Sequence, residues 1–348
     1  MPKLYLREAV GLLLKTTPIL SVRIGSYALL GLGLLAYFAV VGGIAWVLAQ
    51  LWSVLGIVTF IVAFGGAFGI VRWVTRYYFY LLKAAHAAVM TEYIVYGQGP
   101  EGSQLAYGKE QVTSRFNDTS IMFAIDQVLD AVVTGFNRTF TRITDLLPLP
   151  GMDSLQALIR RISRFSTTYI DEAILSRAYK EREPNVWKVA QDGVILYAQG
   201  WKPILANAVA LTLLSYLEFF VFLVVLGLPA VAIGALVPSL SVALGIGVLV
   251  GAWMLKLALA DAYAMAATLL AYHRTTEGMT PDPEWQARLE QASDKFGELK
   301  QKAAEKMSGM ASPKESPDES PADVPSEKTT TEEAVTSSDA PANGNAPG

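Results

Sequence analysis

The 348-residue sequence has no cysteine and only two histidines, His86 and His273. Without cysteine the chain forms no disulfide and has neither a thiolate metal ligand nor a cysteine nucleophile. Neither histidine belongs to a His-Glu-x-x-His pattern, which is the spacing that places two zinc ligands on one face of a helix. We therefore predict no metal site and no cofactor.

Motifs for catalysis and for nucleic-acid binding are missing as well. Gly108-Lys109-Glu110 carries glutamate where a phosphate-binding loop needs Ser or Thr for magnesium. No Gly-x-Ser-x-Gly motif marks a serine nucleophile, and a formal net charge of −3 is not the basic signature of a nucleic-acid-binding protein. These absences favour a protein that is not an enzyme, with no catalytic residue and no nucleic-acid partner.

Charge is scarce, because only 17% of the residues are charged and 52% are hydrophobic. Residues 24–71 carry no formal charge, and residues 203–255 carry only Glu218. A membrane-spanning helix needs about 20 apolar residues, so each block is long enough for two spans. The chain is therefore predicted to be an all-α, polytopic transmembrane protein whose four spans form two helical hairpins.

The turns of these hairpins are predicted from interfacial residues and from helix breakers. A polar amide and a tryptophan at 50–53 suit a membrane interface, and glycine and proline cluster at 227–238. With turns at these two places, the sequence predicts four spans near 24–47, 52–72, 204–226 and 233–256.

Basic residues indicate the orientation of the hairpins. Neither predicted turn contains Lys or Arg, whereas the outer ends of the hairpins are flanked by Arg23, Arg72, Arg76, Lys83, Lys202 and Lys256. Cytoplasmic segments next to membrane spans are enriched in Lys and Arg. We therefore predict a multi-pass protein of the cell membrane with both termini and the central segment in the cytoplasm.

The two hairpins resemble each other in sequence. Pro-Ile-Leu precedes each pair of spans, at 18–20 and at 203–205, and an Ala-rich continuation follows each pair, at 84–91 and 261–268. These similarities indicate an internal repeat of parallel orientation, or else a shared composition of Gly- and Ala-rich membrane helices. Each second span also carries a small-xxx-small step, which predicts close helix packing within the chain or in a homodimer; these steps are Gly65 with Gly69 and Gly247 with Gly251.

The central region is predicted to be cytoplasmic and helical. Apolar residues recur at helical spacing from Ile121 to Ile143, and again in a second helix at 154–180 that also carries Arg160, Arg161 and Arg164. Basic residues beside an apolar stripe suit a helix lying on an anionic membrane surface. A cytosolic helical hairpin packed on itself is the alternative that we favour. A further helix is predicted to begin after Pro184-Asn185 and to lead into the second hairpin.

The C-terminal part changes in composition after residue 277. Apolar residues keep helical register at 283–307, and from Ser308 the sequence is acidic and rich in Ser, Pro and Thr, which predicts disorder. This tail is either a solvating segment or a binding arm for a cytosolic protein. The predicted regions are an N-terminal interfacial helix (1–23), the first hairpin (24–72), the cytoplasmic helical region (73–202), the second hairpin with its extension (203–276), a charged helix (277–307) and the tail (308–348).

Charges inside or beside the spans are the candidate substrate or ion residues. Glu218 is placed within the third predicted span, where an ionised side chain costs about 2.5–3.5 kcal/mol, so it should face protein or water. It is either a ligand site or a helix–helix hydrogen-bonding group. Lys256 and Asp261 are five residues apart, which is not the neighbour spacing of an α-helix, so we expect each to reach water separately.

A family resemblance covers about residues 237–276. Val237-Pro238, a mostly apolar stretch, and then Ala262-Tyr263-Ala264-Met265 and Thr268-Leu269-Leu270 resemble the last membrane segment of choline-transporter-like proteins. Ala267 stands where the family pattern has an acid. The resemblance implies transport of choline or a related cation, and it assigns no functional residue.

These features predict a transport-type protein of the lipid bilayer that binds or moves a small solute or ion, such as a choline-like cation. Since four helices rarely enclose a pathway alone, a homodimer is expected. The alternative is a membrane-anchored scaffold or assembly factor that recruits cytosolic proteins or lipids through its central helices and its tail.

Overall fold

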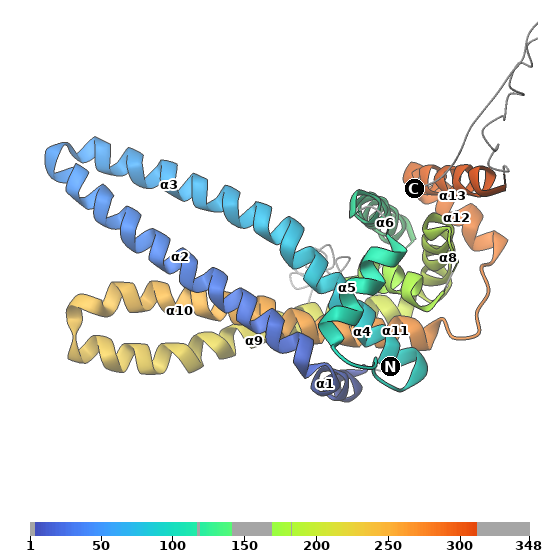
Figure 1. Cartoon of the computed structure of the whole chain (residues 1–348), viewed down its shortest axis with the longest axis horizontal. Helices are drawn as coiled ribbons and strands as arrows, with labels where there is room; N and C mark the ends of the chain where they lie inside the picture. The colour runs from blue at the N-terminus through green and yellow to red at the C-terminus, as the bar shows by residue number, and fades with distance from the viewer. Residues whose placement is uncertain (1–3, 117–118, 141–168, 182, 312–348) are drawn as a thin grey trace, which may run out of the picture. The chain divides into compact units, whose positions relative to one another are not determined.

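The computed structural model describes residues 4–116, 119–140, 169–181 and 183–311 (Figure 1). Every regular element in these ranges is a helix. Four helical stretches are long and apolar enough to cross a membrane: Thr17–Leu51, Ser53–Tyr96, Trp201–Leu236 and Pro238–Thr275. The predicted all-α fold with four spans is confirmed, and the chain is a membrane protein. The basic residues Arg160, Arg161 and Arg164 lie outside the described residues.

Two helical hairpins carry the spans. In the first hairpin α2 (Thr17–Leu51) is followed by α3 (Ser53–Val74), and in the second α9 (Trp201–Leu236) is followed by α10 (Ser241–Leu255). Both hairpins extend to the left in Figure 1, and α2 lies against α10. Many of their large apolar side chains are exposed, as expected for helices that face lipid.

The first hairpin turns where the sequence predicts, but the second does not. Trp52 has an extended backbone, with φ −160° and ψ 119°, and separates α2 from α3. In the second hairpin α9 continues through Gly227 and Pro229, and the chain turns at Pro238–Leu240. The predicted break at 227–238 therefore begins too early. Membrane helices tolerate an internal proline because neighbouring groups can satisfy the freed backbone carbonyl.

Each hairpin continues into a further helix through one turn of π-helix. The first π turn, Thr75–Phe79, joins α3 to α4 (Tyr80–Tyr96). The second π turn, Lys256–Ala260, joins α10 to α11 (Asp261–Thr275). A π turn contains an extra residue compared with an α-helical turn, so the side chains after it are rotated about the helix axis.

The elements around the two hairpins follow the same order. A short helix precedes each hairpin, α1 (Leu6–Lys15) before α2 and α8 (Val186–Gln199) before α9. The buried threonines Thr91 in α4 and Thr268 in α11 each donate a hydrogen bond to the carbonyl four residues earlier, at 2.7 and 2.8 Å. The same succession of elements thus occurs twice, as the predicted repeat requires.

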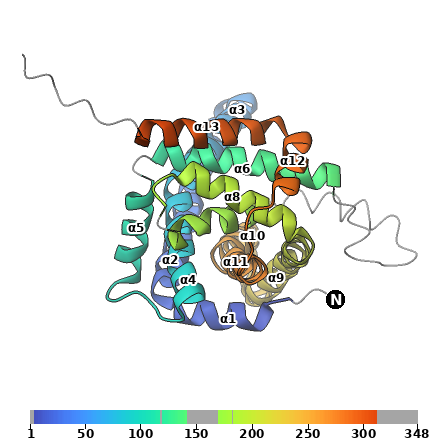
Figure 2. The same cartoon turned by 90° about the vertical axis from the view of Figure 1, so that its right-hand side faces the viewer.

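The other helices form a helical body beside the hairpins. In Figure 2, α4 and α11 lie between α1 on one side and α6, α8 and α13 on the other. The body also includes the helical segment 169–180. The helices not yet bounded are α5 (Gln104–Arg115), α6 (Thr119–Phe140), α12 (Pro283–Ala292) and α13 (Asp294–Ala311).

The apolar stripe of α6 packs inside the body and does not lie on a membrane surface. Ile125, Leu129, Val132 and Phe136 have no exposed surface, and α6 contacts α8 and α12. The favoured alternative, a cytosolic helical hairpin packed on itself, stays a prediction, because residues 141–168 lie outside the described ranges; the described helices that α6 contacts are α8 and α12. The helix predicted after Pro184-Asn185 is also present, and the Asn185 side chain accepts a hydrogen bond from the Lys188 amide at its start.

The C-terminal helices belong to the same core. The predicted single charged helix is broken at Ser293, whose backbone is extended, so that α12 and α13 fold as two helices. Leu289, Phe296 and Leu299 are fully buried, and the Asn185 side chain donates to the Ala303 carbonyl at 2.7 Å. Because α13 continues to Ala311, the predicted disordered tail begins a few residues too early; residues 312–348 lie outside the described ranges.

The small-xxx-small glycines make few contacts within the chain. A Cβ on Gly251 would meet Leu226 at 3.1 Å. A Cβ on Gly65, Gly69 or Gly247 would meet nothing within 4 Å in the described part of the chain. Of the two predicted roles, packing inside one chain therefore applies to Gly251 alone, and packing in a homodimer stays a prediction.

Candidate functional site

A cavity of about 400 Å³ lies where the two π turns meet the helical body. Thr75, Arg76 and Phe79 of the first π turn line it, together with Leu257 of the second π turn. The other lining residues come from α2, α4, α6 and α11, and they are Arg23, Tyr27, Tyr80, Lys83, Phe123, Asp126, Gln127 and Asp261. Both copies of the repeat thus contribute to one polar cavity.

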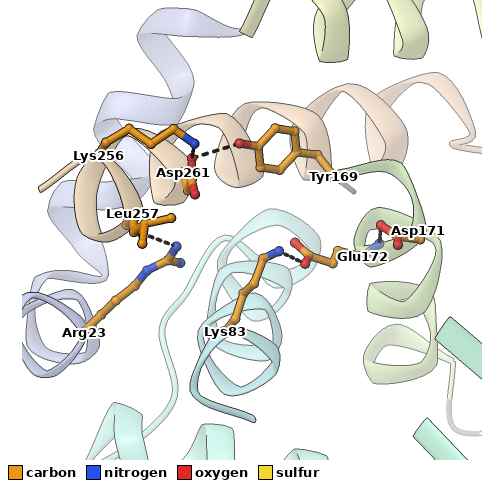
Figure 3. A network of polar contacts seen from close by, with 8 residues as sticks. All are labelled: Arg23, Lys83, Tyr169, Asp171, Glu172, Lys256, Leu257 and Asp261. Carbon is orange, nitrogen blue, oxygen red and sulfur yellow. Dashed lines mark hydrogen bonds and ion pairs between the residues drawn. The ribbon is translucent and has the colours of Figure 1, made fainter. Parts of the chain in front are cut away.

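Asp261 is held at the cavity by three donors, of which Figure 3 shows Lys256 and Tyr169. Its Oδ1 accepts hydrogen bonds from Lys256 Nζ at 2.6 Å, from the Tyr169 hydroxyl at 3.0 Å and from the Ser215 hydroxyl at 3.3 Å. The expectation that Lys256 and Asp261 reach water separately is wrong. The segment between them is π-helical, and a π-helix places residues five apart on the same side.

Arg23 is the most deeply buried charge that faces this cavity. Arg23 is only 2% exposed. Its Nη2 donates a hydrogen bond to the Leu257 carbonyl at 2.9 Å, and this bond joins the first hairpin to the second π turn (Figure 3). Its Nη1 is buried and has no hydrogen-bond partner among the described residues. A buried donor without a partner is costly, so this guanidinium is suited to bind an acceptor that enters the cavity.

A second buried ion pair lies on the body side of the cavity. Lys83 of α4 pairs with Glu172 of the helical segment 169–180, and the Asp171 carboxylate accepts from the Glu172 amide at 2.9 Å. Burial raises the pKa of the Asp171 side chain well above its ordinary value. Burial also raises the pKa of Asp126 on α6 to about 6, although the nearby Lys83 lowers it in part. These carboxylates therefore hold protons more readily than exposed ones.

The lining carries charges of both signs. Arg23, Arg76 and Lys83 are cationic, whereas Asp126 and Asp261 are carboxylates. Arg76 is exposed and so stands at the accessible edge of the site. From the sequence, Arg23, Arg76 and Lys83 count only as flanking basic residues. Asp126 shows no sequence signal beyond a polar position in an amphipathic helix, so the cavity depends on contacts between distant segments.

Glu218, the remaining predicted site residue, lies near the cavity but is not among the described residues that line it. It is partly buried, and its Oε2 has no hydrogen-bond partner in the described ranges. The part of α9 from Glu218 to Leu236 is about 27 Å long at 1.5 Å per residue. Because α9 continues through Gly227 to Leu236, Glu218 lies near the middle of this helix instead of in the second half of a span that ends near 226.

Helix lengths relate the cavity to the bilayer. From Arg72 to the start of α3 at Ser53 the helix is about 29 Å long, close to the ~30 Å of hydrocarbon in a bilayer. By the same measure Lys256 lies about 23 Å from the start of α10 at Ser241. Arg72, Glu218 and Lys256 therefore lie about 23–29 Å from the hairpin turns, and the helices between them and the turns carry no charge. If the turns reach one bilayer surface, the polar cavity lies at the other surface.

Among the described residues, no group of three or more His, Asp or Glu side chains is placed to hold a metal ion. No protein-family model matches this chain, and neither does a curated protein or a solved structure. Its function is therefore inferred from the cavity.

Proposed function

We propose that this chain is a transport-type membrane protein that binds a small charged solute or ion in the cavity between the two π turns. The observation that carries the proposal is Arg23, which lines a cavity of about 400 Å³, is almost completely buried, and has an Nη1 without a hydrogen-bond partner among the described residues. Binding sites at the interface of repeated units are common in transporters.

The position of the cavity would allow ligand binding to change how the two hairpins contact each other. A ligand there touches the first π turn at Arg76 and the second at Leu257, so its binding changes the contact between the two copies of the repeat. π turns inside α-helices occur frequently at functional sites. The carboxylates Asp126 and Asp261 give a cation such as choline a partner, and Arg23 and Arg76 give an anion one.

The four spans do not surround a pathway by themselves. Only 6–17% of their most apolar windows is buried. Transport through this chain therefore requires a second copy, and we propose a homodimer whose apolar hairpin faces enclose the route. The scaffold alternative is weakened at α6, because the apolar face with which that helix would recruit a partner is buried in the body.

A thermal-shift titration of the full-length, detergent-purified protein tests this function. Choline, alkali cations and inorganic phosphate are the probes, because a ligand that binds only the folded state raises the melting temperature. We expect a saturable rise with at least one probe: a response to phosphate should be lost in Arg76→Gln, a response to a cation should be lost in Asp126→Asn, and either should be kept in Arg72→Gln. Arg72 is also exposed, lies one helical turn earlier and does not line the cavity.

The same titration tests whether Glu218 takes part in ligand binding. A response that disappears in Glu218→Gln places Glu218 in the binding mechanism, and an unchanged response removes it. The proposed site is contradicted if no probe shifts the melting temperature, if a phosphate response is equal in Arg76→Gln and Arg72→Gln, or if a cation response is unchanged in Asp126→Asn.

A further inference from the structure

An apolar groove adjoins the polar cavity at Tyr27. A second cavity, of about 310 Å³, lies between α2 and α10 and shares Tyr27 with the polar one. Its lining is apolar apart from the Tyr27 hydroxyl, and it consists of Ile24, Tyr27, Ala28, Gly31, Leu32, Leu35, Leu226, Val250, Gly251, Met254, Leu255 and Ala258. One charged compartment and one apolar compartment thus meet at a single side chain.

Tyr27 is fixed at this junction. It is buried, and its ring stacks on Phe79 of the first π turn with 3.9 Å between the ring centres. The Arg23 guanidinium lies 6.0 Å from the centre of the same ring, one helical turn before Tyr27 on α2. The polar end of the site therefore lies directly beside the body-side end of the groove.

The two compartments lie beside different parts of the hairpins. The groove is lined by the apolar part of α2 and α10, which faces hydrocarbon, and the polar cavity lies at the level of Arg72 and Lys256, where the apolar segments end. An amphiphile can keep its head at the bilayer surface and its chain in the hydrocarbon while both parts contact the protein. A free ion would leave the groove unused.

The charges of the polar cavity select the head group. Arg23 Nη1 and the exposed Arg76 are donors for phosphate, which guanidinium groups bind strongly. Asp126 lines the same cavity and provides a carboxylate for an ammonium group. Asp261 is already bonded to Lys256, Tyr169 and Ser215, which leaves Asp126 as the carboxylate for the ligand.

We propose that the ligand of this site is a zwitterionic phospholipid, whose phosphate binds Arg23 and Arg76, whose ammonium faces Asp126 and whose acyl chain lies in the α2–α10 groove. This inference rests on the proposed function and names the class of its ligand. The protein then binds or moves a membrane lipid at the bilayer surface.

Native mass spectrometry of the full-length protein tests the assignment. Delipidated protein is mixed with phosphatidylethanolamine, with phosphatidylglycerol, which has the phosphate but no amine, or with soluble phosphoethanolamine, which has the head without the chains. We expect one phosphatidylethanolamine per chain, bound at least ten-fold more tightly than either comparison compound. Asp126→Asn should reduce the preference over phosphatidylglycerol.

Two pairs of variants distinguish lipid binding at the proposed site from nonspecific binding of lipid to the protein surface. Arg76→Gln removes a phosphate donor, and Arg72→Gln is its exposed control outside the cavity. Ala28→Trp fills the groove, and Ala39→Trp adds the same side chain at an exposed position of α2 outside it. We expect each cavity or groove variant to lose at least ten-fold in phosphatidylethanolamine affinity and each control to retain it.

The results also separate this inference from the proposed function. Equal loss in variants and controls, or equal binding of the two lipids, overturns the phospholipid assignment. If small ions bind at Arg76 while phosphatidylethanolamine does not, the phospholipid assignment fails and the proposed function stands. If neither lipid nor solute binds at the cavity, both fail.

Discussion

Asp126 is a carboxylate buried where α6 meets the polar cavity. Burial raises its pKa from 3.8 to about 6, with Asp130 on the same helix adding to the rise. Lys83 and Tyr80 of α4 face it and lower the pKa in part, and Asp171 is a further carboxylate near that lysine. Because the folded state holds this proton more tightly than the unfolded state, the associated stability is complete below about pH 4 and is lost as the pH rises through 6.

The loss of stability with rising pH gives a prediction for Asp126→Asn. A shift of this size corresponds to about 3 kcal/mol of stability between pH 4 and pH 7. We expect the melting temperature of the wild-type protein to fall over this interval and that of Asp126→Asn to fall less. Glu110→Gln, at an exposed carboxylate of α5, is the control and should follow the wild type. Parallel curves for wild type and Asp126→Asn would show that Asp126 is not buried in this way.

Single residues also show why the site could be predicted only in part. Lys256 and Asp261 are recognisable in the sequence as charges next to a span, but their pairing depends on the π turn between them. Spacing rules for α-helices assign neighbours at three and four residues, so a five-residue pair is overlooked. Arg23 of α2 and Asp126 of α6 line the same cavity, and such proximity between distant segments leaves no local pattern.

Whole elements are predicted better than single contacts. The hairpins follow from long uncharged segments, and α6 follows from apolar residues at helical spacing, because both signals are local. The end of α9 is misplaced, since glycine and proline break helices in water but not always in lipid. The break at Ser293 was not predicted, because the apolar residues of α12 and α13 keep one helical register across it.

The C-terminal helices α12 and α13 provide a test of whether whole elements belong to the core. Phe296 of α13 is fully buried in the helical body, and truncation of a buried phenylalanine costs about 3–5 kcal/mol. We expect Phe296→Ala to lower the melting temperature of the whole protein and to expose α12 and α13 to limited proteolysis. Lys306→Ala, at an exposed position of the same helix, should leave both measurements unchanged. An unaltered melting temperature in Phe296→Ala would mean that these helices are not part of the core.

At the scale of the whole molecule, the two hairpins determine how the chain crosses the membrane. Each hairpin begins and ends next to the helical body, so both turns lie away from the body (Figure 1). Basic residues are concentrated at the body end of the spans, at Arg72, Arg76 and Lys83 in the first hairpin. Since cytoplasmic flanks carry excess Lys and Arg, the sequence predicts a cytoplasmic body, and on that prediction the cavity lies at the inner surface of the membrane.

The absence of cysteine makes this topology directly testable, because the parent protein gives no background with thiol reagents. Ser53→Cys and Ser239→Cys place exposed thiols at the two turns, and Ser114→Cys places one on α5 of the body. In intact cells a membrane-impermeant maleimide should label the first two variants, and it should label Ser114→Cys only after permeabilisation. Labelling of Ser114→Cys alone would invert the topology and move the cavity to the outer surface. Labelling of only one turn would contradict the parallel repeat, because both turns must then lie on opposite sides of the membrane.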